Sequence, residues 1–454
     1  MIINTNQKDF SDFAINVNFN NKCNKHCSYC FKDSKISELS NQTLYQKIRK
    51  ISDSLPEDKN ITFCFGSMCE VVLSKNQLFK FIDDIPYFMG YFFTEKDFKN
   101  ISAFLSEVNL SSLNDLNNLI CREDFYQLLQ TNIKPDKNFE SRKDYHNEKY
   151  NIIWRNAYLL RLAMPEHFIT KKPPYCTLSF MSNGTILDDE FLTELKSKYV
   201  SNPDDHCIGI SISIDGPEDL HDKLRGKGSY KAAMATVEKL AADPMIRLTH
   251  VSATITNQID DLFEYFKFFY DNFGKRNINV VFSFVRDHPE YWYNTKTIKI
   301  FLRKLNKFYK EIVKKENTGM FLYYFSNRFL TPLGFMLDKV TRLFRCNLYN
   351  TVYIEPDGTI SNCFNGHLRV NITKDDTISP INHNQIMSPY NVFNIKLCKS
   401  CKYKTLCGGP CYSMLLTDME NVKAECILNK FIIKKCKRIY KKTLKTLSTI
   451  SNNG

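Results

Sequence analysis

Short apolar runs alternate with amphipathic stretches over the first 285 residues of the chain. The amphipathic stretches place apolar residues three or four positions apart, which is the period of a helix. A chain that alternates strands with helices predicts a parallel sheet built from βαβ units. Six units of this kind predict an α/β fold, a partial (β/α)6 barrel that is open on one side. The six predicted strands are residues 14–19, 61–65, 176–181, 208–214, 248–255 and 278–284.

One segment interrupts this rhythm, because residues 86–174 separate the second and third predicted strands. Its pattern is mostly helical, over 98–108, 116–129 and 150–164. We interpret it as a helical insertion, which is either decorative or a lid or substrate-docking surface over the barrel mouth. The pattern divides the chain into a first part of the barrel (1–85), the insertion (86–174), the remainder of the barrel (175–320), a linker (321–345), a cysteine-rich domain (346–428) and a basic C-terminal helix or tail (429–454).

The chain has 454 residues, more than one ordinary domain, and includes 16 cysteines. Disulfide-dense secreted scaffolds are short, and residues 1–12 lack the apolar segment of a secretory signal. No run of 18 apolar residues exists, so we expect no membrane span. We therefore expect a cytoplasmic protein, in which clustered thiols serve metal or redox chemistry.

The net charge is +13, and residues 430–445 hold eight Lys or Arg. Such a basic run is typical either of a nucleic-acid contact or of a solvated helix face. We favour the helix, because no nucleic-acid-binding motif accompanies the run. Its apolar positions would then face inward, and they are Phe431, Ile432, Ile439 and Leu444.

Three cysteines stand close together near the start of the chain, Cys23, Cys27 and Cys30. Closely spaced thiolates bind zinc or an iron–sulfur cluster. A structural zinc site needs four ligands, and His26 is awkwardly placed as the fourth because it adjoins Cys27. A [4Fe–4S] cluster held by three thiolates leaves one iron open for a substrate. The loop follows the first predicted strand, so we expect it at the carboxyl edge of the sheet, where parallel sheets bind ligands.

The other cysteines fall into two groups. Seven lie in the last quarter of the chain, and they are Cys346, Cys363, Cys398, Cys401, Cys407, Cys411 and Cys426. Six are isolated, and we expect them to be small buried hydrophobes. They are Cys64, Cys69, Cys121, Cys176, Cys207 and Cys436.

The spacing Cys23-x3-Cys27-x2-Cys30 resembles the cluster motif of the radical S-adenosylmethionine (SAM) superfamily, whose members commonly have an aromatic residue where Tyr29 stands. The resemblance implies a radical SAM barrel over about residues 13–284. It also implies that these three cysteines hold a [4Fe–4S] cluster on which SAM binds.

Other segments agree with this resemblance in order. After the second strand the family carries a Gly-Gly-Glu-Pro-like turn, and Glu70 takes the glutamate position, whereas Cys69 and Val71 depart from the usual glycine and proline. Residues 211–217 (SISIDGP) resemble the fourth strand of peptide- and sulfatase-modifying members. Arginine presents a planar fork to a carboxylate, which suits the SAM carboxylate. The SAM-binding residues that the resemblance implies are Tyr29, Gly66, Glu70, Ser213, Arg225 and Thr254.

The seven C-terminal cysteines, with Gly358 between the first two, resemble the SPASM domain, which carries two auxiliary [4Fe–4S] clusters in many peptide-modifying radical SAM enzymes. A zinc ribbon is the alternative, because paired cysteines also bind zinc. The resemblance implies a distal cluster on Cys398, Cys401, Cys407 and Cys426. It implies a proximal cluster on Cys346, Cys363 and Cys411.

Two departures bear on the reaction. Sulfatase maturases have a further cysteine shortly before the position of Cys346, and residues 340–345 contain none. We hypothesise that the proximal cluster has an open iron that a substrate thiolate could ligate. Sulfatase maturases also place an aspartate after the second proximal cysteine, where Phe364 follows Cys363, and this disfavours a sulfatase maturase.

The resemblance implies an oxidoreductase that cleaves SAM reductively and abstracts hydrogen from a ribosomally made peptide, forming for example a thioether or a carbon–carbon cross-link. The alternatives are a sulfatase-maturase-like enzyme or small-molecule dehydrogenase, and a non-catalytic iron–sulfur or zinc protein. The expected partners are a peptide or protein substrate and a flavodoxin- or ferredoxin-type electron donor. Cys23 lies near the start, so we expect no leader-binding domain before it. Leader recognition would then fall to the insertion or to a separate leader-binding protein, or would not exist. No catalytic acid or base is named by the sequence.

Overall fold

The computed structural model describes residues 12–30, 38–55, 60–67, 69–105, 108–125, 127, 148–164, 176–199, 208–285, 288–314, 332, 335–336, 342, 351–361, 391–411, 414–415 and 419–452. Among the helices of these residues, none combines the length and the apolar character that a bilayer crossing requires.

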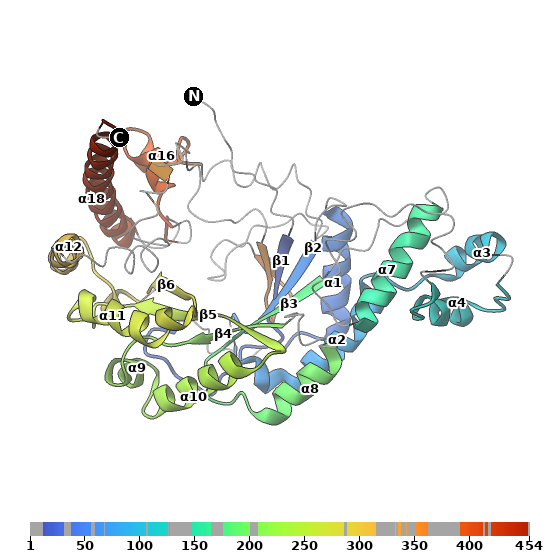
Figure 1. Cartoon of the computed structure of the whole chain (residues 1–454). Helices are drawn as coiled ribbons and strands as arrows, with labels where there is room; N and C mark the ends of the chain where they lie inside the picture. Colours follow the sequence, from blue (N-terminus) through green and yellow to red (C-terminus); the bar gives the residue numbers. More distant parts are fainter. Residues whose placement is uncertain are drawn as a thin grey trace.

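A sheet of eight strands organises the molecule, in the order β6-β5-β4-β3-β2-β1-β7-β8. The six strands predicted from the sequence are parallel, and each pairs with its neighbour in the chain. The predicted α/β fold with a parallel sheet is therefore confirmed (Figure 1). The strands are β1 Asp12–Val17, β2 Asn60–Phe65, β3 Cys176–Ser182, β4 Ile208–Ser213, β5 Ile246–Ile255, β6 Val280–Phe284, β7 Thr351–Ile354 and β8 Ile360–Ser361.

Short polar side chains cap the N-terminal ends of two of the barrel helices. The Ser40 hydroxyl accepts from the backbone N–H of Thr43 at the start of α1, and Asp261 caps α11 in the same way. Their apolar faces cover a core rich in phenylalanine, in which Phe65 stacks on Phe180 at 5.2 Å. The helices are α1 Asn41–Ser54, α2 Lys75–Phe88, α8 Asp189–Tyr199, α9 Glu218–Arg225, α10 Ser229–Ala242, α11 Leu262–Asn272 and α12 Ile298–Lys314.

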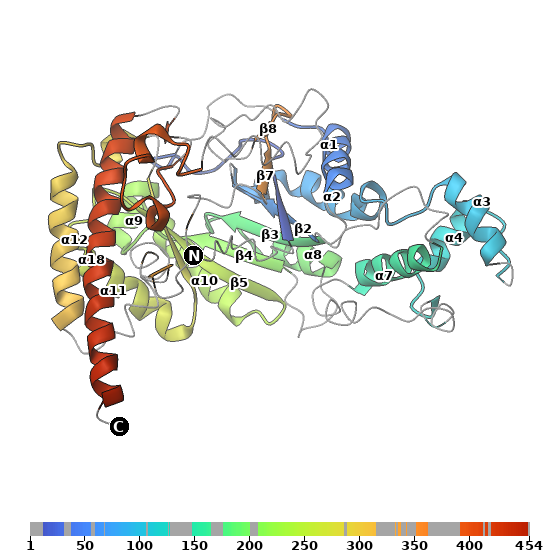
Figure 2. The same ribbon diagram turned by 90° about the horizontal axis from the view of Figure 1, so that it is seen from above.

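The segment between β2 and β3 is helical where it is described, with α3 Glu95–Phe104, α4 Leu113–Ile120 and α7 Glu148–Ala163. Helix α2 runs on through Phe88, so the insertion leaves the barrel within a helix and after the boundary predicted at 85. Figures 1 and 2 show α3 and α4 at the end of the molecule opposite α12 and α18. The insertion therefore extends the molecule on the side away from the cysteine-rich C-terminal region.

The C-terminal region joins the barrel sheet. Strand β7 pairs parallel to β1, and β8 pairs antiparallel to β7. The short helix α16, Lys404–Cys407, packs on α18, Met419–Asn452. The boundary predicted between 428 and 429 lies inside α18, which is one continuous helix.

Helix α18 lies beside α12, as Figure 2 shows. Ile432, Ile433 and Cys436 are buried and Phe431 and Ile439 are partly buried, whereas the lysines of this segment are largely exposed. This matches the solvated-helix interpretation of the basic run. The side chain of Leu444 lies outside the described residues.

Candidate functional site

The carboxyl ends of the parallel strands gather polar residues that are distant in sequence. The three-cysteine loop follows β1, Glu70 follows β2, and Asn183 follows β3. Asp215 follows β4, and Thr254 lies at the end of β5. Carboxyl ends of parallel strands meet at one edge of the sheet, so these side chains come together there.

The three-cysteine loop is tied to its surroundings at both ends. The Asn183 amide nitrogen lies 3.8 Å from the Cys23 sulfur. The backbone N–H of Ser28 donates to the carbonyl of Leu224 in α9 at 2.9 Å, and His288 Nε2 lies 2.9 Å from the Cys30 carbonyl. The loop is therefore held against β3, α9 and the segment after β6.

The thiols of the loop influence one another. Burial raises the pKa of the Cys27 thiol to about 11; the cation of Arg225 opposes the rise, and Cys30 and Cys23 add to it. Cys23 and Cys27 are half-buried, and Cys30 is exposed. A cation beside the thiols favours their anionic form, which is the form that binds metal.

Glu70 joins the turn after β2 to the end of β3. Its carboxylate accepts from the Ser182 hydroxyl and from the Asn183 backbone N–H, both at 2.8 Å, and it is almost completely buried. Burial raises the pKa of Glu70, although the bonds from Asn183 and Ser182 act in the opposite direction. In this structure both carboxylate oxygens bind β3 residues, so the predicted contact with the SAM amino group stays a prediction.

The residue at position 66 must be glycine, because the backbone of β3 passes very close to it. Its φ is +84°, and a Cβ there would lie 2.0 Å from the Met181 carbonyl oxygen. No other residue type fits at this position without moving β3. The turn that brings Glu70 to the site depends on this glycine.

Asp215 is the centre of the site and was not assigned a role by the sequence. It is fully buried, and its carboxylate accepts from the Tyr29 hydroxyl, from Arg225 Nε at 2.6 Å and from the Thr254 backbone N–H at 2.9 Å. Burial works against its ionisation, but the Arg225 charge and the hydrogen bonds from Arg225 and Tyr29 outweigh this and lower the pKa of Asp215. Its only sequence signal was the Asp-Gly-Pro turn after a strand.

Arg225 presents one edge of its guanidinium to Asp215. Nε and Nη2 bind the carboxylate, at 2.6 and 3.3 Å, and the guanidinium carbon lies 5.6 Å from the Tyr29 ring centre. The described residues offer Nη1 no hydrogen bond, so the arginine keeps one nitrogen for a further anion. Ser213 lies at the end of β4 with its side chain nearly buried, two residues before Asp215.

Two further buried polar residues adjoin this centre. His221 Nδ1 accepts from the backbone N–H of Asp215 at 3.1 Å, and burial lowers the pKa of His221 to about 4. The buried Tyr265 hydroxyl has no hydrogen-bond partner among the described residues. Burial raises the pKa of Tyr265, and the Asp215 charge raises it further.

Four C-terminal thiols lie near enough to influence one another electrostatically. Burial raises the pKa of Cys398 to about 11, with further contributions from Cys407 and Cys401, and it raises that of Cys426 to about 12, with contributions from Cys407 and Cys398. These are the four residues that the sequence assigned to a distal cluster. Cys411 is buried, and its backbone N–H donates to Glu425 at 2.9 Å. Cys346 and Cys363 lie outside the described residues.

The sequence was compared with protein-family models and with known proteins. No protein-family model matches the chain. A cysteine-type anaerobic sulfatase-maturating enzyme of Clostridium novyi (strain NT) is 24% identical over 264 residues, which are 51% of this chain and 63% of the relative. The match thus spans less than two thirds of the relative's length.

Solved structures resemble nearly the whole chain. The structure of anSMEcpe with bound AdoMet, which is SAM, aligns with a TM-score of 0.55 at 14% identity, over 95% of this chain and 98% of that chain. The structure of anSMEcpe with AdoMet and a Cp18Cys peptide aligns with a TM-score of 0.55 at 14% identity, over 96% and 99%. The chain shares the fold of anSMEcpe.

The described cysteines have the chemistry of iron–sulfur cluster ligands. In such a cluster each thiolate binds a separate iron, and thiols that share one neighbourhood at the end of a turn and a helix meet this need. Among the described residues, no three side chains of Cys, His, Asp or Glu converge as ready ligands of a single metal ion. Cys398, Cys401, Cys407 and Cys426 nevertheless influence one another electrostatically.

The isolated cysteines differ in burial. Cys176 and Cys436 are buried as expected, and Cys64 and Cys69 are half-buried. The expectation was wrong for Cys121, which is exposed because it caps the end of α4 at the surface. Cys207 lies outside the described residues.

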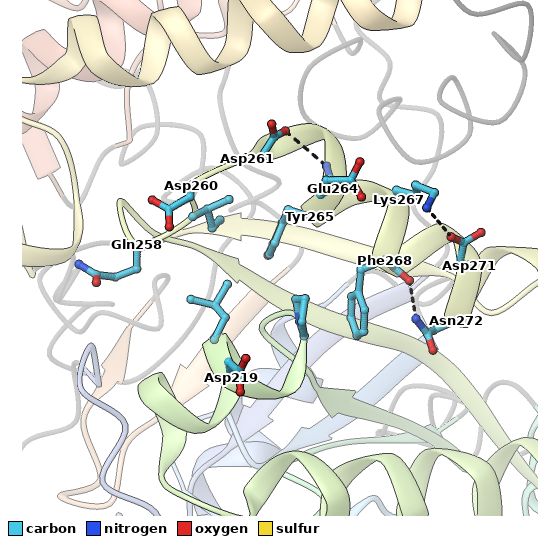
Figure 3. Close-up of a pocket in the computed structure, with 13 residues that line it drawn as sticks. Asp219, Gln258, Asp260, Asp261, Glu264, Tyr265, Lys267, Phe268, Asp271 and Asn272 are labelled. Atoms are coloured by element: carbon cyan, nitrogen blue, oxygen red, sulfur yellow. Dashed lines mark hydrogen bonds and ion pairs between the residues drawn. The ribbon is translucent and has the colours of Figure 1, made fainter.

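A separate pocket lies between α9 and α11, with a volume of about 530 Å³ (Figure 3). Several acidic side chains line it, among them Asp219, Asp260 and Glu264. Two of its aspartates pair with lysines of α12: Asp261 with Lys307 at 2.6 Å and Asp260 with Lys304 at 3.8 Å. The pocket therefore presents partly neutralised acids and none of the cysteines.

Proposed function

We propose that this chain is a cytoplasmic radical SAM maturase that oxidatively modifies a peptide. The observation that carries the proposal is the three-cysteine loop, held at the carboxyl edge of the parallel sheet beside the buried Asp215–Arg225 pair. The sequence match to a sulfatase-maturating enzyme and the fold shared with a protein that binds AdoMet support it.

Cys23, Cys27 and Cys30 would hold the catalytic cluster, and the residues around them would hold SAM. When bound together, the cluster and SAM supply one-electron cleavage to methionine and a 5′-deoxyadenosyl radical, which abstracts hydrogen from carbon. Arg225 Nη1 suits the SAM carboxylate, since Asp215 occupies the other edge of the guanidinium. Tyr29 binds Asp215, and Glu70 binds Ser182 of β3, so both residues fix the shape of the site.

SAM cleavage tests the enzyme class. We expect anaerobically reconstituted protein to form 5′-deoxyadenosine from SAM with dithionite, and Cys27→Ala to form none. Cys121→Ser, an exposed cysteine away from the site, serves as the matched control and should keep the activity. Iron-loaded protein that forms no 5′-deoxyadenosine would favour a non-catalytic iron–sulfur or zinc protein.

The substrate is the finer part of the proposal. We propose a ribosomally made peptide that gains a thioether or carbon–carbon cross-link, with auxiliary clusters on Cys398, Cys401, Cys407, Cys426 and on Cys346, Cys363, Cys411. Sulfatase maturation is the second candidate, because the curated relative carries that activity in its name and a structural neighbour binds a Cp18Cys peptide.

Mass spectrometry separates the two substrates. A cysteine-containing sulfatase-type peptide and short peptides encoded beside the gene would each be incubated with the enzyme, SAM and reductant. Loss of two hydrogens together with loss of the free thiol identifies a thioether. Conversion of cysteine to formylglycine identifies sulfatase maturation, and unchanged peptides of both kinds count against a peptide substrate.

A further inference from the structure

A lysine-rich surface lies around Cys398, Cys401, Cys407 and Cys426, the four C-terminal cysteines that influence one another electrostatically. We call it the lysine surface and define it as Lys396, Lys399, Lys402, Lys404, Lys430 and Lys437. All but the half-buried Lys404 are exposed. The segment 391–407 that carries four of them contains no Asp or Glu. Among the described residues, no acidic side chain forms an ion pair with any of the six.

The positive charge lies next to the thiols. Burial raises the pKa of Cys398, while Lys404 and Lys430 lower it, and Lys430 acts on Cys426 in the same direction. Cys401, Cys407 and Cys426 are only half-buried. A cluster on these cysteines would therefore lie close to the protein surface and within the field of the lysines.

Apolar side chains stand exposed among the lysines. Phe393 is 43% exposed, Leu397 41% and Ile427 39%, and the three lie in the segments that carry the lysines. The ammonium of Lys404 lies 5.0 Å from the Phe393 ring centre and donates to the Lys399 carbonyl at 2.8 Å. An apolar centre with a charged rim is the usual composition of a protein-docking surface.

Aromatic packing also orders the rim. The ammonium groups of Lys402 and Lys437 lie 5.4 and 5.1 Å from the centre of the Tyr403 ring, and Tyr403 itself is buried. Lys402 of the segment 391–407 and Lys437 of α18 thus pack on the same Tyr403 ring. Two segments distant in sequence lie side by side there, as the contact of α16 with α18 shows (Figure 1).

We propose that the lysine surface docks an acidic electron-carrier protein of the flavodoxin class. The inference deepens the proposed function and rests on it. An acidic carrier complements the lysines and brings its cofactor near Cys401, Cys407 and Cys426. One electron would leave the reduced carrier, enter the cluster that these cysteines would hold, and pass on to the cluster of Cys23, Cys27 and Cys30, with no bond made or broken.

Binding to a purified flavodoxin tests the proposal independently of SAM chemistry. Calorimetry on the reconstituted full chain should show binding at about 0.05 M salt that weakens at about 0.3 M. The triple variant Lys396→Glu, Lys399→Glu, Lys402→Glu should bind about tenfold more weakly or worse, since rim charges govern electrostatic docking. The control variant Lys96→Glu, Lys99→Glu, Lys227→Glu makes the same charge change at exposed sites elsewhere and should bind as the parent does.

A second variant approaches the surface from α18. Lys430→Glu with Lys437→Glu should weaken flavodoxin binding in the same way, even if the triple variant disturbs its loop. Dithionite reduces the clusters without docking, so both variants should cleave SAM with dithionite at the parental rate and fail only with reduced flavodoxin.

Three results would overturn the proposal. They are no binding of flavodoxin to the parent, equal affinity in the surface and control variants, and binding of duplex DNA that the same substitutions abolish while flavodoxin does not bind. Failure of dithionite-driven SAM cleavage in the parent would instead contradict the proposed function. The calorimetry would still test flavodoxin binding, because it does not depend on SAM cleavage.

Discussion

At the residue scale, the site depends on a buried ion pair, Asp215 with Arg225. Asp215 is fully buried and Arg225 nearly so, and each supplies the other's counter-charge. Removing one partner of such a pair leaves an uncompensated charge in the interior, which is strongly destabilising. Tyr29 binds the same carboxylate, so the position of the cysteine loop depends on that charge.

Asp215→Asn should lower the free energy of unfolding by about 3–5 kcal/mol. Urea unfolding followed by fluorescence measures this in a Trp154→Phe background, in which Trp292, buried against Phe284 beside β6, is the remaining tryptophan. The control is Asp83→Asn, which removes an exposed pair with Lys198 and should cost about 1 kcal/mol at most. An equal loss of unfolding free energy in the two variants would contradict the buried ion pair of Asp215.

His221 should make stability depend on pH. Burial lowers its pKa to about 4 in the folded chain, whereas an unfolded histidine has a pKa near 6.5. The unfolded chain binds more protons between these values, so the stabilisation is complete above about pH 6.5 and is lost as the pH falls toward 4. The loss approaches about 3 kcal/mol.

Replacing His221 by asparagine isolates this contribution, because its side-chain oxygen can still accept from the Asp215 backbone N–H. The variant should be less stable than the parent at pH 7, and the difference should narrow on acidification. Burial also lowers the pKa of His250, but His250 is present in both proteins, so its contribution cancels in the comparison. Parallel stability curves would show that His221 is not held neutral.

At the scale of elements, the insertion is joined by buried polar contacts as well as by packing. The fully buried Asn156 of α7 donates through its amide nitrogen to the Ile120 carbonyl at 2.9 Å and the Arg122 carbonyl at 2.8 Å. The Ile120 carbonyl lies at the C-terminal end of α4, where carbonyls lack partners inside the helix, and the Arg122 carbonyl lies just beyond that end. One side chain thus fixes α4 against α7.

Asn156→Asp should loosen the insertion and leave the barrel intact, because a carboxylate cannot donate to either carbonyl. We expect a local loss of about 3 kcal/mol. Hydrogen exchange of α4 and the fluorescence of Trp154, in a Trp292→Phe background, report this change. The exposed Asn114→Asp should change neither, and a barrel that unfolds together with α4 would show that the insertion is not a separate unit.

At the scale of the whole molecule, the C-terminal region is attached through the sheet as well as through the helix pair α12 and α18. Strand β7 extends the barrel sheet next to β1, and the Asn18 backbone N–H donates to the Ile354 carbonyl at 3.1 Å. The strand that leads into the first cysteine loop is thus the neighbour of the strand that opens the C-terminal region. Loading of clusters in either region should therefore stabilise the common sheet.

Iron uptake should raise the thermal midpoint of the chain, since the folded ligands bind and unfolded ones bind less. Cys398→Ser with Cys426→Ser should reduce the iron content by about four atoms per chain from about twelve. Cys121→Ser should retain the parental content. A double variant with as much iron as this control would exclude Cys398 and Cys426 as ligands of a distal cluster.

The six parallel strands and most helices could be predicted from the sequence, because period and capping are local properties. The nearness of Cys398, Cys401 and Cys407 is local too, since the three lie within one short segment of the chain. Predicted strand limits differ from those observed by about two residues at most, as in β1 and β6.

The composition of the site and the place of β7 in the sheet were decided by contacts between residues distant in sequence. Asp215 became the centre of the site only when the fold brought Tyr29, Arg225 and Thr254 to it. The pairing of β7 with β1 joins residues more than 300 positions apart, and no local pattern specifies such a partner. Spacing along the chain thus determined which thiols act together, and tertiary packing determined which charges surround them.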